Sequence, residues 1–278
     1  MLGWIIGIGL LIIVLVLLER EIYFYEGVHL GPRVQGWLYD RWAARYDVDK
    51  RESQAHDAEV LARPLLKILA EENIPDALVL DVATGTGRFP AVLLQEPAFK
   101  GHIIAVDISR EMLALAAEKT APFKNRVALI RQTALRLPFP DNSFDVVSCL
   151  EALELMPNMA EPLAELARVL RPGGVLLTTR GTEASGRVAK ILSADKFTAL
   201  VQTSGFERIE IIPWWRCFDR VWARKTGQSG PVGARAITDV LQCPVCGRAT
   251  LTTLDSGALR CSECQTEIAV TPEGIFLL

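Results

Sequence analysis

The sequence lacks a strong excess of charge of either sign. It has 30 Lys and Arg residues against 33 Asp and Glu residues, and its formal net charge is −3. A chain that holds nucleic acid needs a basic field to neutralise the phosphates. No run of basic residues provides such a field here. The composition therefore argues against nucleic acid as a partner.

The start of the chain also lacks charge. Residues 2–18 read Leu-Gly-Trp-Ile-Ile-Gly-Ile-Gly-Leu-Leu-Ile-Ile-Val-Leu-Val-Leu-Leu, and no Lys or Arg precedes Arg20. A cleaved signal peptide would need a positive start and a small-residue cleavage site, and this segment has neither. An apolar run of about this length, apolar on every face, is typical of a helix that crosses a bilayer. We therefore expect residues 1–18 to be a transmembrane helix.

The basic residues near this segment lie only on its C-terminal side. They are Arg33, Arg41, Arg45, Lys50 and Arg51. The positive-inside rule then places the rest of the chain in the cytoplasm. We expect a cell-membrane protein with a single-pass anchor, with juxtamembrane or N-terminal cap helices over residues 19–57 and a cytoplasmic catalytic domain.

A glycine-containing loop lacks the third glycine of a dinucleotide site. An apolar run at residues 77–80 ends in Asp81, and Gly85 and Gly87 follow before a helical pattern begins. Pyrophosphate-binding loops use three glycines at such a strand-to-helix turn, whereas residues 89–90 are Phe-Pro. An acid before the glycines suits a cationic amine. The loop therefore favours a ligand with an amino-acid end and no pyrophosphate.

A second acid follows twenty residues beyond Gly87. The apolar run at residues 103–106 ends in Asp107. An acid at the end of the second strand binds the ribose hydroxyls in doubly wound nucleotide sites. An ordinary helix cap is the alternative role for this side chain. S-adenosylmethionine combines an amino-acid end with a ribose and has no phosphate, so it matches both acids.

Strand-like and helix-like segments alternate through the middle of the chain. Expected strands are 77–80, 103–106, 127–130, 145–149 and 175–179, expected helices are 61–69, 89–94, 160–170 and 190–204, and two closing strands are 207–212 and 220–224. Such alternation predicts an α/β fold with a mostly parallel sheet and right-handed crossovers.

Residues 79–180 resemble the class I S-adenosylmethionine-dependent methyltransferases, in the group that acts on small molecules, quinones and lipids. Residues 81–87, Asp-Val-Ala-Thr-Gly-Thr-Gly, match the first motif of that family with Ala83 at its first glycine. The resemblance implies a Rossmann-like sheet of seven strands and S-adenosylmethionine as cofactor. It also implies that residues 39–47 form a helix that closes over the cofactor.

The resemblance further implies a set of cofactor-binding residues: Asp81 at the methionine amine, Gly85 and Gly87 beneath the methionine, Asp107 at the ribose, Ile108 and Ala134 at the adenine, with Ala83, Thr133 and Leu150 beside them. Thr133 stands where the family has an acid. Glu151 and Glu154 are candidates for a general base, or they face solvent or cap the next helix. The His pair that many relatives carry near Glu154 is absent, so no catalytic residue is assigned.

Four of the 6 cysteines cluster near the C-terminus. Cys243 with Cys246, and Cys261 with Cys264, form two Cys-x-x-Cys pairs. This spacing suits one structural Zn²⁺ held by four thiolates. We expect a methyltransferase domain over residues 58–226, a linker at 227–236 and a zinc ribbon at 237–278.

The C-terminal residues 272–278 resemble the tail of small zinc-ribbon proteins that partner and activate methyltransferases. The ribbon is therefore expected to pack on the catalytic domain or to receive a protein partner. The expected function is methyl transfer to a lipophilic small molecule, a quinone or a lipid, at the cytoplasmic membrane face. The alternatives are methylation of a protein or RNA recruited by the ribbon, and a non-catalytic membrane scaffold or assembly factor that retains the fold.

Overall fold

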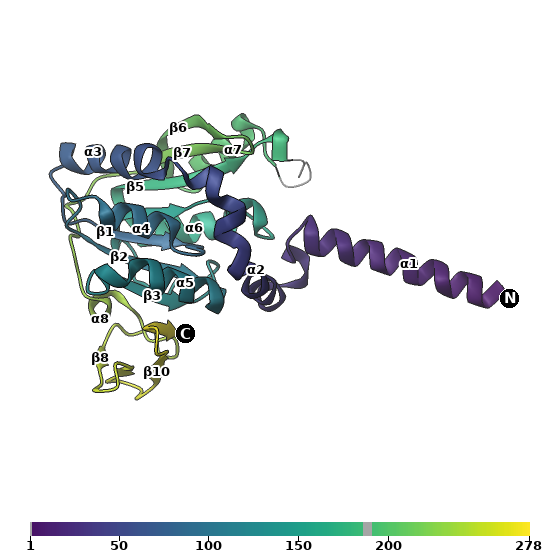
Figure 1. Cartoon of the computed structure of the whole chain (residues 1–278). Helices are drawn as coiled ribbons and strands as arrows, with labels where there is room; N and C mark the ends of the chain where they lie inside the picture. The colour runs from purple at the N-terminus through teal and green to yellow at the C-terminus, as the bar shows by residue number, and fades with distance from the viewer. Residues whose placement is uncertain (1, 186–190) are drawn as a thin grey trace.

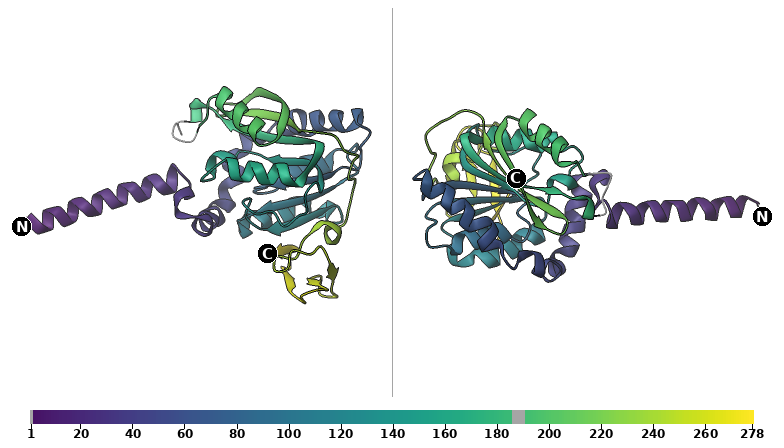
Figure 2. Two further views of the ribbon diagram at one scale, coloured as in Figure 1. Left: turned by 180° about the vertical axis from the view of Figure 1, so that it is seen from behind. Right: turned by 90° about the horizontal axis from the view of Figure 1, so that it is seen from above.

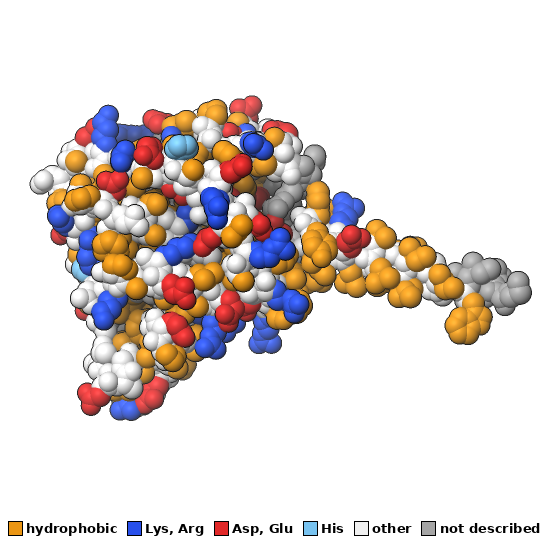
Figure 3. Space-filling model, in the orientation of Figure 1, with side chains coloured by type: hydrophobic (Ala, Val, Ile, Leu, Met, Phe, Trp, Pro, Cys, Tyr) orange, Lys and Arg blue, Asp and Glu red, His pale blue; other side chains and the backbone are white. Residues whose placement is uncertain are grey.

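The computed structural model describes residues 2–185 and 191–278 (Figure 1). The chain begins with helix α1 (Leu2–Tyr23), which projects from the rest of the molecule in both views of Figure 2. Its apolar side chains from Ile6 to Leu18 are exposed, as Figure 3 shows.

The predicted transmembrane helix is not supported. In the part of the chain that the structure describes, no helix is both long enough and apolar enough to span a membrane. The uncharged stretch of α1 stops at Leu18, because Glu19, Arg20 and Glu21 occupy the following turn of the same helix. The prediction of a single-pass cell-membrane protein is thereby contradicted, and the predicted orientation toward the cytoplasm loses its basis.

Seven strands form the sheet of the central domain. They are β1 (Leu78–Val82), β2 (His102–Asp107), β3 (Val127–Arg131), β4 (Phe144–Cys149), β5 (Leu170–Gly181), β6 (Phe206–Trp215) and β7 (Phe218–Lys225). Their order is β6-β7-β5-β4-β1-β2-β3. β7 pairs antiparallel with β5 and β6, and the other pairs are parallel. The predicted Rossmann-like fold is confirmed.

Helices cover both faces of this sheet. They are α3 (Arg63–Glu71) after a π-helical turn (Ala58–Ala62), α4 (Arg88–Gln95), α5 (Arg110–Thr120), α6 (Ala160–Val169) and α7 (Ala194–Thr203), with short 3₁₀ turns at Ala121–Phe123, Leu153–Leu155 and Glu183–Ser185. Alternate residues of β1 point to opposite faces. Leu78 and Leu80 pack in the cluster that contains α6 and α7, whereas Val79 packs in the cluster that contains α3 and α4.

A long helix, α2 (Pro32–Gln54), follows a short turn at Val28–Leu30 and packs against α5 near the carboxyl ends of the strands (Figure 1). Three polar contacts tie it there: Asp40 accepts the Ser109 hydroxyl at 2.6 Å, Asp47 pairs with Lys119 at 2.7 Å, and Lys50 pairs with Glu151 at 2.6 Å. Asp47 follows Asp40 by about two turns, and Lys50 lies within one turn of Asp47. The contacts therefore fix residues 40–50 of the helix over the sheet edge.

The C-terminal unit continues the same sheet. It contains α8 (Ile237–Val240), β8 (Leu251–Thr253), β9 (Leu259–Cys261), β10 (Glu267–Val270) and β11 (Ile275–Leu277). β11 pairs in parallel with β3, with Ile275 opposite Leu129, and the order continues β3-β11-β10-β9-β8. Ile275 is fully buried in the cluster that contains Leu113 of α5. The end of the chain thus closes one edge of the central sheet.

Candidate functional site

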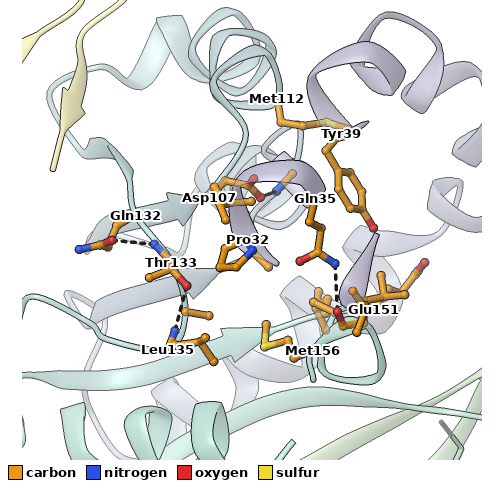
Figure 4. Close-up of a pocket in the computed structure, with 18 of the residues that line it drawn as sticks. Pro32, Gln35, Tyr39, Asp107, Met112, Gln132, Thr133, Leu135, Glu151 and Met156 are labelled. Carbon is orange, nitrogen blue, oxygen red and sulfur yellow. Dashed lines mark hydrogen bonds between the residues drawn. The ribbon is translucent and has the colours of Figure 1, made fainter. Parts of the chain in front are cut away.

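A cavity lies beneath α2 at the carboxyl ends of β1, β2 and β4 (Figure 4). Seven of the predicted cofactor residues line it: Ala83, Gly85, Asp107, Ile108, Thr133, Ala134 and Leu150. From the opposite side it is lined by Pro32, Gln35, Tyr39 and Tyr46 of α2. Sequence motifs indicated the sheet side. The α2 side was indicated only by a resemblance, because helical spacing does not reveal which element a helix covers.

Asp107 holds the glycine loop in place. Its carboxylate, labelled in Figure 4, accepts the backbone N–H group of Gly85 at 2.8 Å and that of Ser109 at 2.8 Å. Gly85 has φ 55°, and Ala83 has the same φ although it is not a glycine. A residue with a Cβ in this left-handed region costs roughly 1–2 kcal/mol, so the strain is localised where the backbone approaches the cavity.

A smaller cavity adjoins the first one at the opposite end of the loop. It is lined by Asp81, Gly85, Arg88 and Glu151, among others. Asp81 accepts the hydroxyls of Thr84 and Ser148, both at 2.6 Å. A carboxylate beside this cavity complements the ammonium of an amino acid, and Arg88 keeps one N–H for its carboxylate beyond the four given to Asp57, Glu151 and the Ser53 carbonyl. Sequence reasoning missed Arg88, although its place directly after Gly87 was a usable signal.

Gly87 lines neither cavity. It has φ 75°, and a Cβ at this position would lie 2.8 Å from the Cβ of Ala116 on α5. The residue begins α4, so its missing side chain allows α4 and α5 to approach one another closely. The structure thus places eight of the nine predicted residues at the cavities and gives Gly87 a packing contact.

Glu151 is buried in an ionic cluster. Its carboxylate lies 2.6 Å from the ammonium of Lys50 and 2.6 Å from the guanidinium of Arg88, which also pairs with Asp57. Burial alone would raise the pKa of Glu151, but the two cations outweigh it and the pKa is lowered. A carboxylate held in the ionised state by two cations is a weak base. Glu154 is also buried, so neither acid projects into solvent.

The loop after β3 forms the remaining wall. Gln132 accepts the backbone N–H of Thr133 at 2.8 Å, and the Thr133 hydroxyl accepts the N–H of Leu135 at 3.3 Å (Figure 4). The hydroxyl retains its own proton as a donor. Thr133 can therefore still donate a hydrogen bond at the cavity wall, at the position where the family has an acid.

The four clustered cysteines converge in the C-terminal unit. Their sulfur atoms lie within 4.8 Å of one another, with 3.5 Å between Cys243 and Cys264 and 3.5 Å between Cys246 and Cys261. Four thiolates bound to one Zn²⁺ at about 2.3 Å lie about 3.8 Å apart. The donor set therefore fits one zinc ion. A complete set of four sulfur ligands leaves no open position for chemistry.

Ligand binding in the cavity is expected to depend on pH. Burial raises the pKa of both Asp81 and Asp107 to about 6. An ammonium and ribose hydroxyls interact best with ionised carboxylates, so the affinity for S-adenosylmethionine should rise as the pH rises through this value. Calorimetry from about pH 5 to about pH 7.5 should show a gain of roughly tenfold for each carboxylate.

The stability of the ligand-free protein should change in the opposite direction. Because these folded-state pKa values exceed the unfolded value of about 4, the two groups stabilise the fold at low pH, and that contribution is lost as the pH rises through about 6. If the affinity for S-adenosylmethionine stayed constant from about pH 5 to about pH 7.5, contact between this ligand and the carboxylates of Asp81 and Asp107 would be contradicted.

Residues 80–178 match the family model described as "Methyltransferase domain". The chain carries a methyltransferase domain. The matched range spans every predicted cofactor residue, so the prediction of a class I S-adenosylmethionine-dependent methyltransferase domain is confirmed. Residues before 80 and after 178 lie outside this match.

The domain is similar to demethylmenaquinone methyltransferase of Bacillus licheniformis. The two are 39% identical over 117 residues, which are 41% of this chain and 50% of the relative. The chain thus spans about half the length of the curated relatives it matches. The activity, substrate and partners of the whole protein are therefore matters for proposal.

Two solved structures share the fold at low identity. The CurJ carbon methyltransferase superposes with a TM-score of 0.54 at 16% identity, covering 61% of this chain and 54% of the other. The [4+2]-cyclase SpnF superposes with a TM-score of 0.50 at 21% identity, covering 59% and 82%. Their names refer to different reactions, so this likeness identifies the fold alone.

Proposed function

We propose that this protein transfers the methyl group of S-adenosylmethionine to a quinone-type aromatic ring. The observation that carries the proposal is the arrangement of charge along one cavity. Asp107 lies at one end, and Asp81 and Arg88 lie at the other. This order matches a ribose followed by an amino acid. The name of the Bacillus licheniformis relative supports a quinone as the acceptor.

S-adenosylmethionine, when bound, supplies a methyl group that is already activated for displacement. The protein's task is then to hold the acceptor atom in line with that methyl group, and positioning of this kind contributes roughly 7–11 kcal/mol. Helix α2 lines one side of the cavity. Tyr46 and Leu150 line the cavity beside the glycine loop. The quinone would react in its reduced, hydroxyl-bearing form, because only an electron-rich ring carbon attacks a sulfonium methyl group.

The C-terminal unit has a separate proposed role. We infer that residues 237–278 form a zinc ribbon, that Cys243, Cys246, Cys261 and Cys264 hold one structural Zn²⁺, and that residues 58–226 form the catalytic unit. The pairing of β11 with β3 supports a module that acts on its own chain. The predicted linker, residues 227–236, is held to the central sheet as well, because Asp145 of β4 accepts the N–H groups of Val232 and Gly233 at 2.8 and 2.9 Å.

Incubation of the full chain with S-adenosylmethionine and reduced 1,4-naphthoquinone tests the methyl-transfer proposal. We expect a ring-methylated naphthoquinol and an equal amount of S-adenosylhomocysteine, both measured by mass spectrometry. The Asp107→Ala variant is the matched control and should form neither product. Binding of S-adenosylmethionine without methylation of the naphthoquinol would contradict the proposed acceptor and favour the scaffold alternative.

A further inference from the structure

A second, larger cavity lies beside the first and is also lined by α2. We call it the acceptor cavity; it is lined by Tyr23, Trp42, Arg45, Lys50, Glu154 and Phe218, and it shares Tyr39, Tyr46, Glu151 and Leu155 with the cofactor cavity. These four shared side chains line both cavities. A molecule in the acceptor cavity would therefore lie beside the methyl donor.

Five of the 16 residues that line the acceptor cavity are aromatic, beside seven charged ones. Tyr23, Tyr39, Trp42, Tyr46 and Phe218 come from α1, α2 and the start of β7. Aromatic side chains bind planar rings through stacked and edge-to-face contacts, with ring centroids about 4.5–7 Å apart. Burial raises the pKa of Tyr46, so its phenol stays protonated. The lining suits a planar aromatic molecule.

Lys50 brings a positive charge among these rings. Its ammonium nitrogen lies 5.8 Å from the ring centroid of Tyr46 and 5.8 Å from that of Phe218. Its side chain is 32% exposed, and its ion pair with Glu151 is 2.6 Å long. An ammonium group has three donors, and Glu151 accepts one of them. Lys50 can therefore donate a hydrogen bond to an oxygen atom on a ring that occupies the cavity.

Other charged and titratable groups also line the acceptor cavity. The acids are Glu26, Asp49, Glu151 and Glu154, the other bases are Arg41 and Arg45, and Cys217 and the three tyrosines complete the set. Glu26 accepts the hydroxyl of Tyr39, and Glu151 is paired with two cations. The guanidinium of Arg41 lies 5.1 Å from the ring centroid of Trp37. Among the three cationic side chains that line the acceptor cavity, we therefore single out Lys50, whose ammonium is near two rings of the lining, Tyr46 and Phe218.

We propose that the acceptor cavity binds an aromatic hydroxyl compound as its oxyanion, with the Lys50 ammonium as the contact for the oxygen. This inference rests on the proposed function and names its substrate class. In the reaction, a carbon of the oxyanion ring forms a bond to the methyl carbon, and the carbon–sulfur bond breaks with its electron pair on sulfur. The proton of that ring carbon then leaves to water as the ring regains its aromaticity.

The binding of 2-naphthol to the full chain tests this inference without any turnover. The neutral and ionised forms of this probe differ in absorbance and fluorescence, so a pH titration reports the pKa of the bound hydroxyl. An opposite charge within hydrogen-bond reach lowers a pKa by about 1–3 units. We expect the pKa of bound 2-naphthol to fall by about one unit or more relative to free probe.

Lys119 provides a matched control for the structural role of Lys50. Both side chains tie α2 to the domain by an ion pair, at 2.6 Å for Lys50 and 2.7 Å for Lys119, and they are 32% and 30% exposed. Lys119 does not line the acceptor cavity. Lys50→Met should abolish the pKa shift of the probe, Lys50→Arg should restore it, and Lys119→Met should retain it.

The outcomes separate this inference from the proposed function. A bound probe with an unshifted pKa in the natural protein would overturn the Lys50 assignment, whatever the methyltransferase assay shows. Tighter binding of 1-naphthylmethylammonium than of 2-naphthol would overturn it as well, because the carboxylates would then define a cation site. A lowered probe pKa without methylation of naphthoquinol would support the oxyanion site and contradict the proposed reaction.

Discussion

An Asp107→Ala variant should bind S-adenosylmethionine about 100-fold more weakly than the natural protein, or weaker still. In the folded protein Asp107 is 8% exposed, and its carboxylate orders the loop through the N–H groups of Gly85 and Ser109. The substitution removes the acceptor for the ribose hydroxyls and leaves two backbone donors without their partner. Hydrogen bonds to charged groups contribute about 1.5–3 kcal/mol each, so two lost ribose contacts correspond to an affinity loss of about 100-fold or more.

Isothermal titration calorimetry at neutral pH measures this loss directly. Asp107→Asn is the matched variant, because its amide oxygen can still accept one of the hydrogen bonds without a charge. We expect its affinity to lie between those of the natural protein and Asp107→Ala. Thermal unfolding of all three proteins separates loss of the site from loss of the fold. A folded Asp107→Ala protein with unchanged affinity would contradict the ribose assignment.

Local patterns in the sequence predicted the sheet well, because each strand is a short apolar run between turns. The strand expected at residues 77–80 is β1 (Leu78–Val82), and that expected at 103–106 is β2 (His102–Asp107). The observed strands extend into Asp81 and Asp107, since pairing within a buried parallel sheet continues through an acid whose carboxylate is hydrogen-bonded. Hydrophobicity marks the core of a strand, whereas tertiary pairing sets its end.

The parts of the site that the sequence did not reveal depend on contacts between distant segments. Lys50 and Glu151 are 101 positions apart, and Arg88 joins Glu151 across 63 positions. No local pattern encodes such a pair, because each residue alone resembles a surface charge. Glu151 also adopts φ 52°, a left-handed conformation that its sequence neighbours do not predict. The helix over the cavity was predicted by resemblance, but its ionic attachment was not.

Removal of the metal from the C-terminal unit should destabilise that unit and also lower the affinity of the cofactor cavity for S-adenosylmethionine. A unit of this size has a small core, and binding of structural Zn²⁺ contributes about 10–16 kcal/mol to folding in comparable peptides. Without the ion, the pairing of β11 with β3 should be lost. β3 ends at Arg131, and the next residues, Gln132 to Leu135, line the cofactor cavity.

A second contact links the metal cluster to the same wall. The backbone N–H of Gln242, the residue before Cys243, donates to the carbonyl of Pro138 at 2.8 Å. Pro138 follows the loop that contains Thr133 and Ala134, so the cluster and β11 hold this loop from both of its ends. Chelation should therefore lower the thermal unfolding temperature and reduce the affinity for S-adenosylmethionine several-fold.

Cysteine variants make this test specific to the cluster. Cys264→Ala removes one sulfur ligand, whereas Cys217→Ala removes a cysteine outside the cluster and serves as the matched control. Only the first should lose bound zinc, hydrogen-exchange protection in β3 and β11, and affinity for the cofactor. If β11 lost its protection while the affinity stayed unchanged, the cofactor wall would be stable without the C-terminal unit. The pairing of β11 with β3 would then serve the stability of that unit alone, because the loop after β3 would keep its shape without it.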